Sequence, residues 1–272
     1  MQKALISGIS LSVLCSIIGL FLVLRRQALF GDALSHMAFG GIAVGIYSNV
    51  YPLWTAFILS IVASIGITKI RQITNLPSDS LIAVLLSFGF SLGVILISLS
   101  NGFSVDLFSF LFGSILLVNN IDIVTIILST ISIAIITKIF FKKFMYLSFD
   151  EDQAKASGLS VSKLNYLFVT MVAVTVIVSM KLAGILLISS LLVLPNLSAL
   201  LLGYGFKKTL LISIIISISC VFFGILLSYA LDLAPSGTVV MALVGIFIGI
   251  FFKKGLFKNY ASINRLRNMP HH

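Results

Sequence analysis

The sequence has few charged residues. Only 10% of its 272 residues are charged, whereas 59% are apolar, and its mean hydropathy is +1.19. Soluble domains average about 25% charged residues, so this composition excludes a soluble globular protein and indicates a membrane protein. Acidic residues are the scarcer sign, eight against eighteen Lys and Arg, which gives a net charge of +10. Because the cations lie between apolar blocks, we interpret them as determinants of membrane orientation and not as a nucleic-acid surface.

Side chains that carry chemistry are also scarce. The two cysteines, Cys15 and Cys220, lie inside apolar runs, which excludes a disulfide framework, a zinc finger and a thiol redox centre. Glutamate occurs once, at Glu151, and the apolar segments hold neither paired carboxylates nor a His-Glu-x-x-His motif. An intramembrane enzyme needs converging catalytic groups, so the sequence disfavours one.

Uncharged stretches divide the chain into nine candidate membrane helices, each near the ~20 residues that cross a bilayer core. The predicted spans are 4–24, 33–49, 53–70, 80–100, 121–140, 164–180, 183–203, 208–231 and 236–252. No signal-peptide cleavage site follows the first block, so we expect it to remain as the first span. A short apolar piece at 107–118 is either a tenth span or a re-entrant segment. With no alternating strand pattern, we expect an all-α polytopic membrane protein forming one domain, 1–272.

The placement of Lys and Arg decides between these counts, because cytoplasmic loops accumulate cations. Nine crossings with the C-terminus inside place sixteen cations on the cytoplasmic side and only Lys3 and Lys181 outside, whereas a crossing by 107–118 gives 13 inside and 5 outside. We therefore predict about nine transmembrane helices plus a short re-entrant segment, with the N-terminus outside. The loop 142–163 and the tail 253–272 are then cytoplasmic.

The strongest candidate site is the segment Gly31-Asp32-Ala33-Leu34-Ser35-His36. His36 is the only histidine outside the C-terminal pair, and Asp32 lies four residues before it. Residues four apart share a helix face, so the carboxylate and the imidazole can converge on one ion. These donors suit Mn²⁺, Zn²⁺ or Fe²⁺, and an incomplete ligand set lets a transported ion leave. The structural alternative is that Asp32 caps a helix N-terminus and His36 is an interfacial histidine bonded to a carbonyl.

A second candidate lies in the loop 146–158. Ser148 can cap a helix, with Glu151 three residues later as in a capping box, and Gly158 can end it. We predict a short surface helix between two spans. It is either a solvated loop helix or a docking element that fits another protein's groove.

Four segments together resemble the permease subunits of ABC-type manganese, zinc and iron importers, and the match covers nearly the whole chain in order. The segments are Leu24-Arg25-Arg26 through Gly31–His36, Phe149-Asp150-Glu151-x-x-Ala154-x-x-x-Gly158, Gly184–Pro195 and Leu231–Gly237. The Gly-Asp-Ala-Leu-Ser-His element is the most specific of them. The resemblance also implies a fold like that of the larger cobalamin and siderophore permeases, with one helix fewer.

The resemblance implies a set of partners. These are a second permease copy, as a homodimer or a heterodimer with a similar permease, two cytoplasmic ATPase subunits, and an extracytoplasmic solute-binding lipoprotein that delivers metal. The chain would lie in a prokaryotic cytoplasmic membrane, among its lipids, and bind no nucleic acid. ATP would be hydrolysed on the partner, so the chain is not expected to be an enzyme, and its only metal would be the transported ion.

The resemblance also implies roles for individual residues. Asp32 and His36 would be metal ligands along the translocation path. The acidic loop helix would be the coupling helix that enters the ATPase groove, with five matching residues: Phe149, Asp150, Glu151, Ala154 and Gly158.

Two positions depart from the family pattern and bear on the path. The family usually has Pro after a His-x-x-Leu step, where this chain has Phe39-Gly40, and small residues after Val-x-Pro, where this chain has Asn196. We expect Gly40, Gly41, Pro195 and Asn196 to line the path, although small residues also serve ordinary helix packing. Two other functions remain open: a secondary transporter with Asp32 as its proton site, and an ABC permease for a metal chelate.

Overall fold

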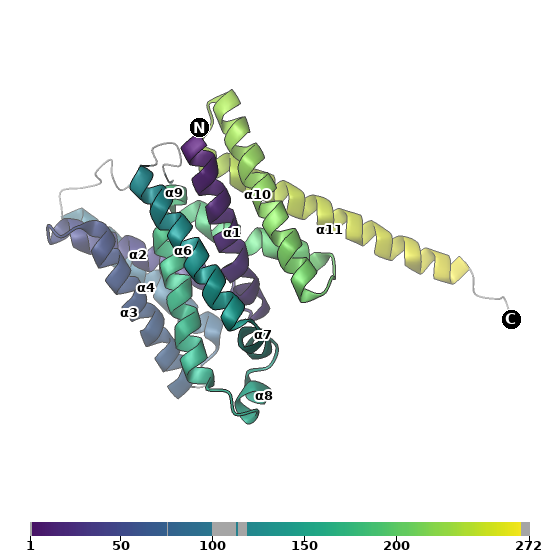
Figure 1. Cartoon of the computed structure of the whole chain (residues 1–272), viewed down its shortest axis with the longest axis horizontal. Coiled ribbons are helices and arrows are strands. Elements are labelled where there is room, and N and C mark those ends of the chain that lie inside the picture. The colour runs from purple at the N-terminus through teal and green to yellow at the C-terminus, as the bar shows by residue number, and fades with distance from the viewer. Residues whose placement is uncertain (1, 75, 100–112, 114–118, 268–272) are drawn as a thin grey trace.

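The computed structural model describes residues 2–74, 76–99, 113 and 119–267, with side chains up to Lys254. Within these residues all regular structure is helical, which confirms the all-α prediction (Figure 1). The helices are α1 (Gln2–Leu24), α2 (Phe30–Tyr47), α3 (Pro52–Ile73), α4 (Ser78–Leu99), α6 (Asn120–Ile139), α7 (Phe141–Phe149), α8 (Glu151–Ala156), α9 (Val161–Leu201), α10 (Phe206–Leu231) and α11 (Pro235–Arg267).

Seven of the described helices are long and apolar enough to cross a membrane: α1, α3, α4, α6, α9, α10 and the Pro235–Lys254 part of α11. Two features account for the difference between these seven helices and the nine predicted spans. Helix α2 has 18 residues, but Asp32, His36 and its glycines lower its hydropathy, and α9 covers the predicted spans 164–180 and 183–203 as one element. The nine-span count therefore stays a prediction. The predicted re-entrant piece 107–118 lies outside the described residues apart from Gly113.

Helix α9 is broken at Gly184. Its 41 residues correspond to about 60 Å at ~1.5 Å per residue, twice the ~30 Å of a hydrocarbon core. Gly184 has φ 73° and ψ 166°, a conformation that L side chains rarely adopt, and it separates two helical segments. Gly113 packs on this break so closely that an added Cβ would lie 2.4 Å from the Ala183 carbonyl carbon. The break makes two shorter helices from a run that is too long for one crossing.

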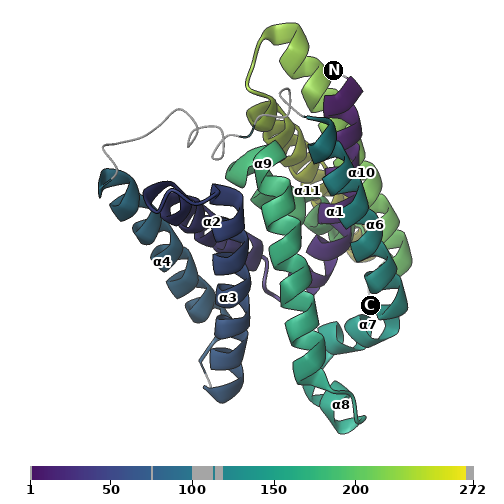
Figure 2. The same cartoon turned by 60° about the vertical axis from the view of Figure 1, so that its left-hand side comes forward.

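The helices form two groups on either side of α9. Helices α2, α3 and α4 lie on one side, and α1, α6, α10 and α11 lie on the other, with α7 and α8 at one end of the molecule (Figure 2). Helices α1, α2 and α9 are the most buried, whereas α3, α6 and α10 expose apolar side chains such as Leu128 (67% exposed) and Phe223 (66%). In a membrane, lipid acyl chains would cover these exposed apolar side chains. At the end opposite α8, an ion pair of 2.5 Å between Lys181 and Asp122 joins α9 to α6.

Small residues bring α2 close to α3 and α4. A Cβ on Gly40 would lie 2.7 Å from the Gly89 carbonyl oxygen of α4, and one on Gly41 would lie 2.5 Å from the Ala56 Cα of α3. Such contacts leave no room for larger side chains. Gly89 in turn packs on the backbone of His36 and Met37, so α4 fixes the helix turn that carries His36.

Candidate functional site

The candidate metal pair lies in the first two turns of α2. Asp32 is in the first turn and His36 follows one turn later, with 3.9 Å between Asp32 Oδ1 and His36 Nε2. Their side chains are 27% and 21% exposed, respectively. The i, i+4 spacing therefore does bring a carboxylate oxygen and an imidazole nitrogen together on one face, as the sequence predicts.

The alternative interpretation, in which Asp32 caps α2 and His36 is bonded to a carbonyl, requires hydrogen bonds that are not found among the described residues. The residue before α2 is Leu29, and no side chain caps this helix by hydrogen bonding. The His36 Nδ1 atom is buried without a hydrogen-bond partner in the described part of the chain, and its ring stands edge-on to Phe90 with 5.5 Å between centroids. The ring nitrogen that faces Asp32 is Nε2, and the opposite nitrogen, Nδ1, is the one that lacks a partner among the described residues.

Two donors are too few to trap a metal ion. Among the residues that the structure describes, no group of three or more His, Cys, Asp and Glu side chains could hold a metal. A metal about 2.1 Å from each donor leaves neighbouring donors roughly 3.0–3.4 Å apart, so the observed 3.9 Å needs to shorten by roughly 0.5–0.9 Å. The pair can act as two ligands of a site completed by water, backbone or another chain.

The other predicted path residues lie in helix packing. Gly40 and Gly41 form the close contacts of α2 described above. Pro195 and Asn196 lie buried in the second segment of α9. The Asn196 amide donates to the Leu192 carbonyl oxygen at 2.9 Å, and its Oδ1 accepts a hydrogen bond from the Ser213 hydroxyl at 2.7 Å. Their place along a path stays a prediction.

The loop 142–163 contains two helices, α7 and α8, where the sequence predicted one. The prediction that Ser148 caps the loop helix is wrong: the Ser148 hydroxyl donates to the Phe144 carbonyl oxygen inside α7. Asp150 is the cap, and its Oδ1 accepts from the backbone amides of Asp152 (3.1 Å) and Gln153 (2.9 Å). Helix α8 ends just before Gly158, whose φ of +80° fits the predicted glycine stop.

The predicted coupling residues differ in what they face. Phe149 is 68% exposed, and Asp152 and Gln153 on the first turn of α8 are also exposed. Ala154 is fully buried against the chain's own core. The surface exposed at α8 therefore includes Phe149, Asp152 and Gln153, whereas Ala154 packs inward, and the coupling role of these residues stays a prediction.

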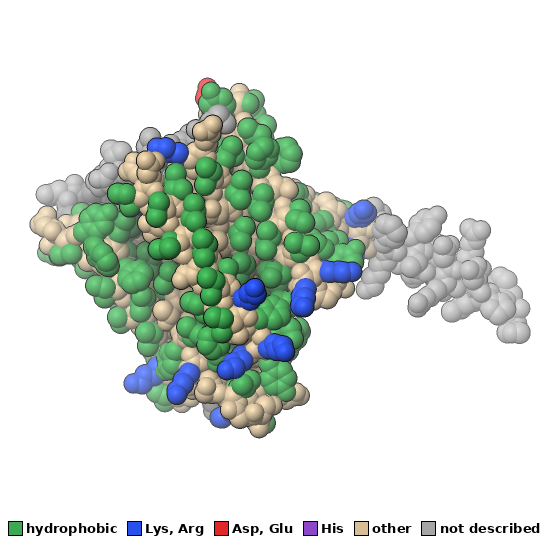
Figure 3. All heavy atoms as spheres, in the orientation of Figure 1, with side chains coloured by type: hydrophobic (Ala, Val, Ile, Leu, Met, Phe, Trp, Pro, Cys, Tyr) green, Lys and Arg blue, Asp and Glu red, His purple; other side chains and the backbone are tan. Residues whose placement is uncertain are grey.

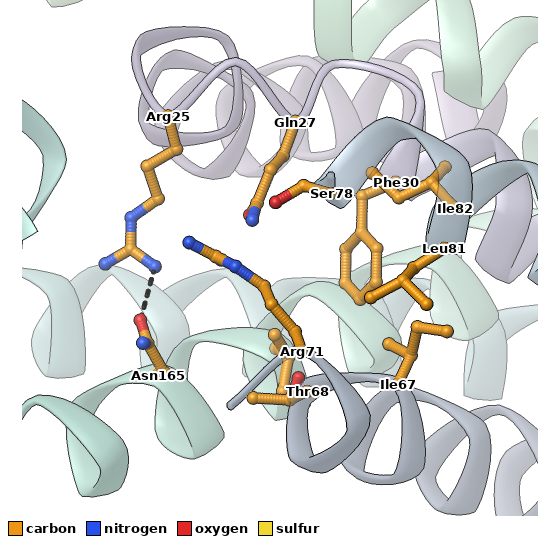
Figure 4. Close-up of a pocket in the computed structure, with 11 residues that line it drawn as sticks. Arg25, Gln27, Phe30, Ile67, Thr68, Arg71, Ser78, Leu81, Ile82 and Asn165 are labelled. Atoms are coloured by element: carbon orange, nitrogen blue, oxygen red, sulfur yellow. Dashed lines mark hydrogen bonds between the residues drawn. The ribbon is translucent and has the colours of Figure 1, made fainter. Parts of the chain in front are cut away.

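A polar network that the sequence did not reveal ties α8 to three other helices. Glu151 Oε2 forms an ion pair with Arg71 Nη2 of α3 at 2.8 Å, and Glu151 Oε1 accepts from the Asn165 amide of α9 at 2.8 Å. Asn165 Oδ1 accepts from Arg25, directly after α1, at 3.1 Å (Figure 4). Arg25 also lies over the Phe168 ring, 4.1 Å from its centroid. This network, Arg25–Asn165–Glu151–Arg71, links α1, α3, α8 and α9.

Burial changes the electrostatics of Arg25. Loss of solvation lowers the pKa of its guanidinium to about 10, although the carboxylate of Glu151 opposes the shift. Arg25 therefore remains a half-buried cation at neutral pH. Beside it, Gln27, Arg71 and Ser78 line a small pocket of about 30 Å³, into which their polar groups point (Figure 4).

Comparison with known protein families identifies the family of this chain. The model of the ABC 3 transport family matches residues 1–254. The chain belongs to the ABC 3 transport family. Relatives of this ABC 3 chain include a manganese transport system membrane protein, MntC, of Listeria monocytogenes, 32% identical over 94% of this chain and 92% of that protein.

Further matches cover about nine tenths of this chain. A high-affinity zinc uptake system membrane protein, ZnuB, of Haemophilus influenzae is 30% identical over 92% of this chain and 96% of that protein. The solved structure of PsaBC from Streptococcus pneumoniae, in complex with Fab, matches with a TM-score of 0.81 and 30% identity over 92% of this chain and 90% of that chain. ABC 3 membership makes the chain a membrane permease subunit, with ATP hydrolysis on a partner chain.

Proposed function

We propose that the chain is the membrane subunit of an ATP-driven importer of divalent transition-metal ions, Mn²⁺, Zn²⁺ or Fe²⁺. The observation that carries the proposal is the Asp32–His36 pair, whose Oδ1 and Nε2 atoms lie 3.9 Å apart on one face of α2. Carboxylate suits Mn²⁺ and imidazole suits Zn²⁺. Family membership and the manganese and zinc relatives support the same substrate class.

The proposed assembly has the chain as a homodimer in a prokaryotic cytoplasmic membrane, with the α8 end facing the cytoplasm and the N-terminus outside. Each copy carries nine spans and binds one ATPase subunit at α8, and an extracytoplasmic solute-binding protein delivers the ion. The cations of Arg71, Lys142 and Lys163 at the α8 end support this orientation.

We further propose that the network around Glu151 transmits ATPase motion to the metal pair. The ATPase contacts α8 through Phe149 and the exposed first turn, and Glu151 passes the displacement to α3 and, through Asn165, to Arg25. Only five residues, 25–29, separate the end of α1 from the start of α2. A movement of Arg25 therefore acts on the helix that carries Asp32 and His36. A proton-driven transporter, the alternative, leaves α8 and its network without a role.

Transport by the reconstituted complex tests the proposal. We would measure uptake of Mn²⁺, Zn²⁺ and Fe²⁺ into proteoliposomes holding this chain, its ATPase and its binding protein, with and without ATP. ATP-dependent uptake of at least one ion is expected. ATP turnover without uptake of any of the three ions would overturn the substrate class, and a chelate would then be the substrate. Uptake driven by a proton gradient without ATP would overturn the ABC mechanism.

A further inference from the structure

A groove between α1, α6, α7 and α10 combines an apolar floor with a basic rim. Its volume is about 450 Å³, and its floor includes Ile17 and Leu210. Three lysines line it: Lys138 at the end of α6, Lys142 at the start of α7 and Lys207 at the start of α10. We call this the lysine groove.

The three lysines gather without compensating acids. All three are exposed, and within the described part of the chain none of them forms an ion pair. Thr137, beside Lys138, is 5% exposed, and its buried hydroxyl finds no hydrogen-bond partner among the described residues. The groove therefore offers clustered positive charge.

The helices that form the groove present apolar surface away from the lysines. On α6, Leu128, Ile131 and Ile135 are 67%, 51% and 52% exposed, and on α10 Leu211 and Ile215 are 59% and 54% exposed. Figure 3 shows hydrophobic side chains covering this face, with Lys and Arg gathered towards the end that carries α7 and α8. The lysines thus lie where an apolar surface gives way to a basic one, at the level expected for lipid headgroups.

We propose that the lysine groove binds an anionic diacyl phospholipid. Its phosphate lies among the ammonium groups of Lys138, Lys142 and Lys207, and one acyl chain follows the apolar floor over Ile17. A soluble acidic protein is a poorer occupant, because Ile139 next to Lys138 is 70% exposed and needs an apolar cover. The bound lipid joins α10 to α7, which leads directly into α8. The proposal requires only that the chain spans a membrane, so it stands or falls separately from metal transport.

Native mass spectrometry of the purified complex would test this by titration with phosphatidylglycerol and with phosphatidylcholine. The test variant is Lys138→Ala/Lys142→Ala/Lys207→Ala. A matched variant, Lys3→Ala/Lys163→Ala/Lys253→Ala, removes the same charge from exposed positions elsewhere. Since each basic residue near an anionic lipid contributes about a fivefold factor, we expect the test variant to bind phosphatidylglycerol at least tenfold more weakly. The matched variant should bind as wild type does, and Lys→Arg at the three groove positions should preserve binding.

Three outcomes would overturn the proposal. Equal loss in the test and matched variants would show that net charge alone attracts the lipid. Equal binding of both lipids by wild type would remove the requirement for an anion. Unchanged phosphatidylglycerol binding by the test variant, with weakened binding of the ATPase, would assign the lysines to the protein partner.

Discussion

Glu151 and Arg71, eighty residues apart in the chain, form an ion pair of 2.8 Å at the end of the molecule that carries α8. Glu151 is the only glutamate in the sequence, and its second oxygen accepts from Asn165. This carboxylate is therefore the point at which the proposed docking helix meets the transmembrane helices α3 and α9.

Reversing the charge of Glu151 should uncouple ATP hydrolysis from transport. Glu151→Lys places a third cation beside Arg71 and Arg25. Repulsion between these like charges should displace α8 from its contacts with α3 and α9. We expect metal uptake to fall at least tenfold while ATP hydrolysis continues. Asp79→Asn at the start of α4 is the control, since Asp79 is exposed and forms no ion pair among the described residues, and it should transport normally. Coupled transport by Glu151→Lys would contradict the role of the network.

Removing the cap of α8 should loosen that helix. Asp150 accepts two backbone hydrogen bonds at the start of α8, so Asp150→Ala should destabilise the helix by about 0.5–2 kcal/mol. Hydrogen exchange at the amides of Asp152 and Gln153 should accelerate several-fold, whereas Asp150→Asn should retain most of the protection. Ser148→Ala, at the residue first predicted as the cap, should leave those amides unchanged. Faster exchange in Ser148→Ala alone would contradict the assignment.

Because α4 packs closely on the helix turn that carries His36, stability and transport should be sensitive to a side chain added at Gly89. A Cβ on Gly89 would lie 2.6 Å from the Met37 amide nitrogen, so Gly89→Ala must push α4 away from α2. We expect lower thermal stability and a severalfold loss of metal uptake. Gly66→Ala on α3 is the matched control, because nothing lies within 4 Å of its Cβ position. It should be neutral or stabilise the helix by up to about 1 kcal/mol. Equal effects of the two variants would argue against the tight α2–α4 contact.

The sequence predicted the long helices well because their signal is local. Uncharged runs bounded by cations or by turn residues fall on α1, α3, α4, α6 and α10 within a few residues. The break at Gly184 could not be read from composition, since glycine also occurs where helices simply pack closely. The predicted spans 164–180 and 183–203 were instead separated at Lys181, and the structure interrupts α9 three residues later, at Gly184.

The candidate sites follow the same rule: the sequence predicted contacts between residues close in the chain and missed contacts between residues far apart in it. The i, i+4 spacing of Asp32 and His36 was sufficient to place them together. Ser148, Asp150 and Asp152 can all cap a helix, and the choice depends on how far α7 extends, which the sequence does not show. Arg25 and Arg71 were interpreted as orientation signals because their partners, Asn165 for Arg25 and Glu151 for Arg71, lie far along the chain. The only glutamate in a basic protein was the available signal for this network.

The most direct test of the proposed function is ATP-dependent uptake of Mn²⁺ and Zn²⁺ by a variant that lacks both donors of the metal pair. Asp32→Asn/His36→Gln keeps the size of both side chains, and Asp232→Asn, at an exposed turn after α10, is the matched control. Uptake and ATP hydrolysis would be measured on the same proteoliposomes. We predict that the double variant assembles and hydrolyses ATP but loses at least 90% of its uptake, an order-of-magnitude effect of losing two ligands, each worth about tenfold or more, while the control transports normally. Normal uptake by the double variant would contradict the assignment of Asp32 and His36 as the metal ligands.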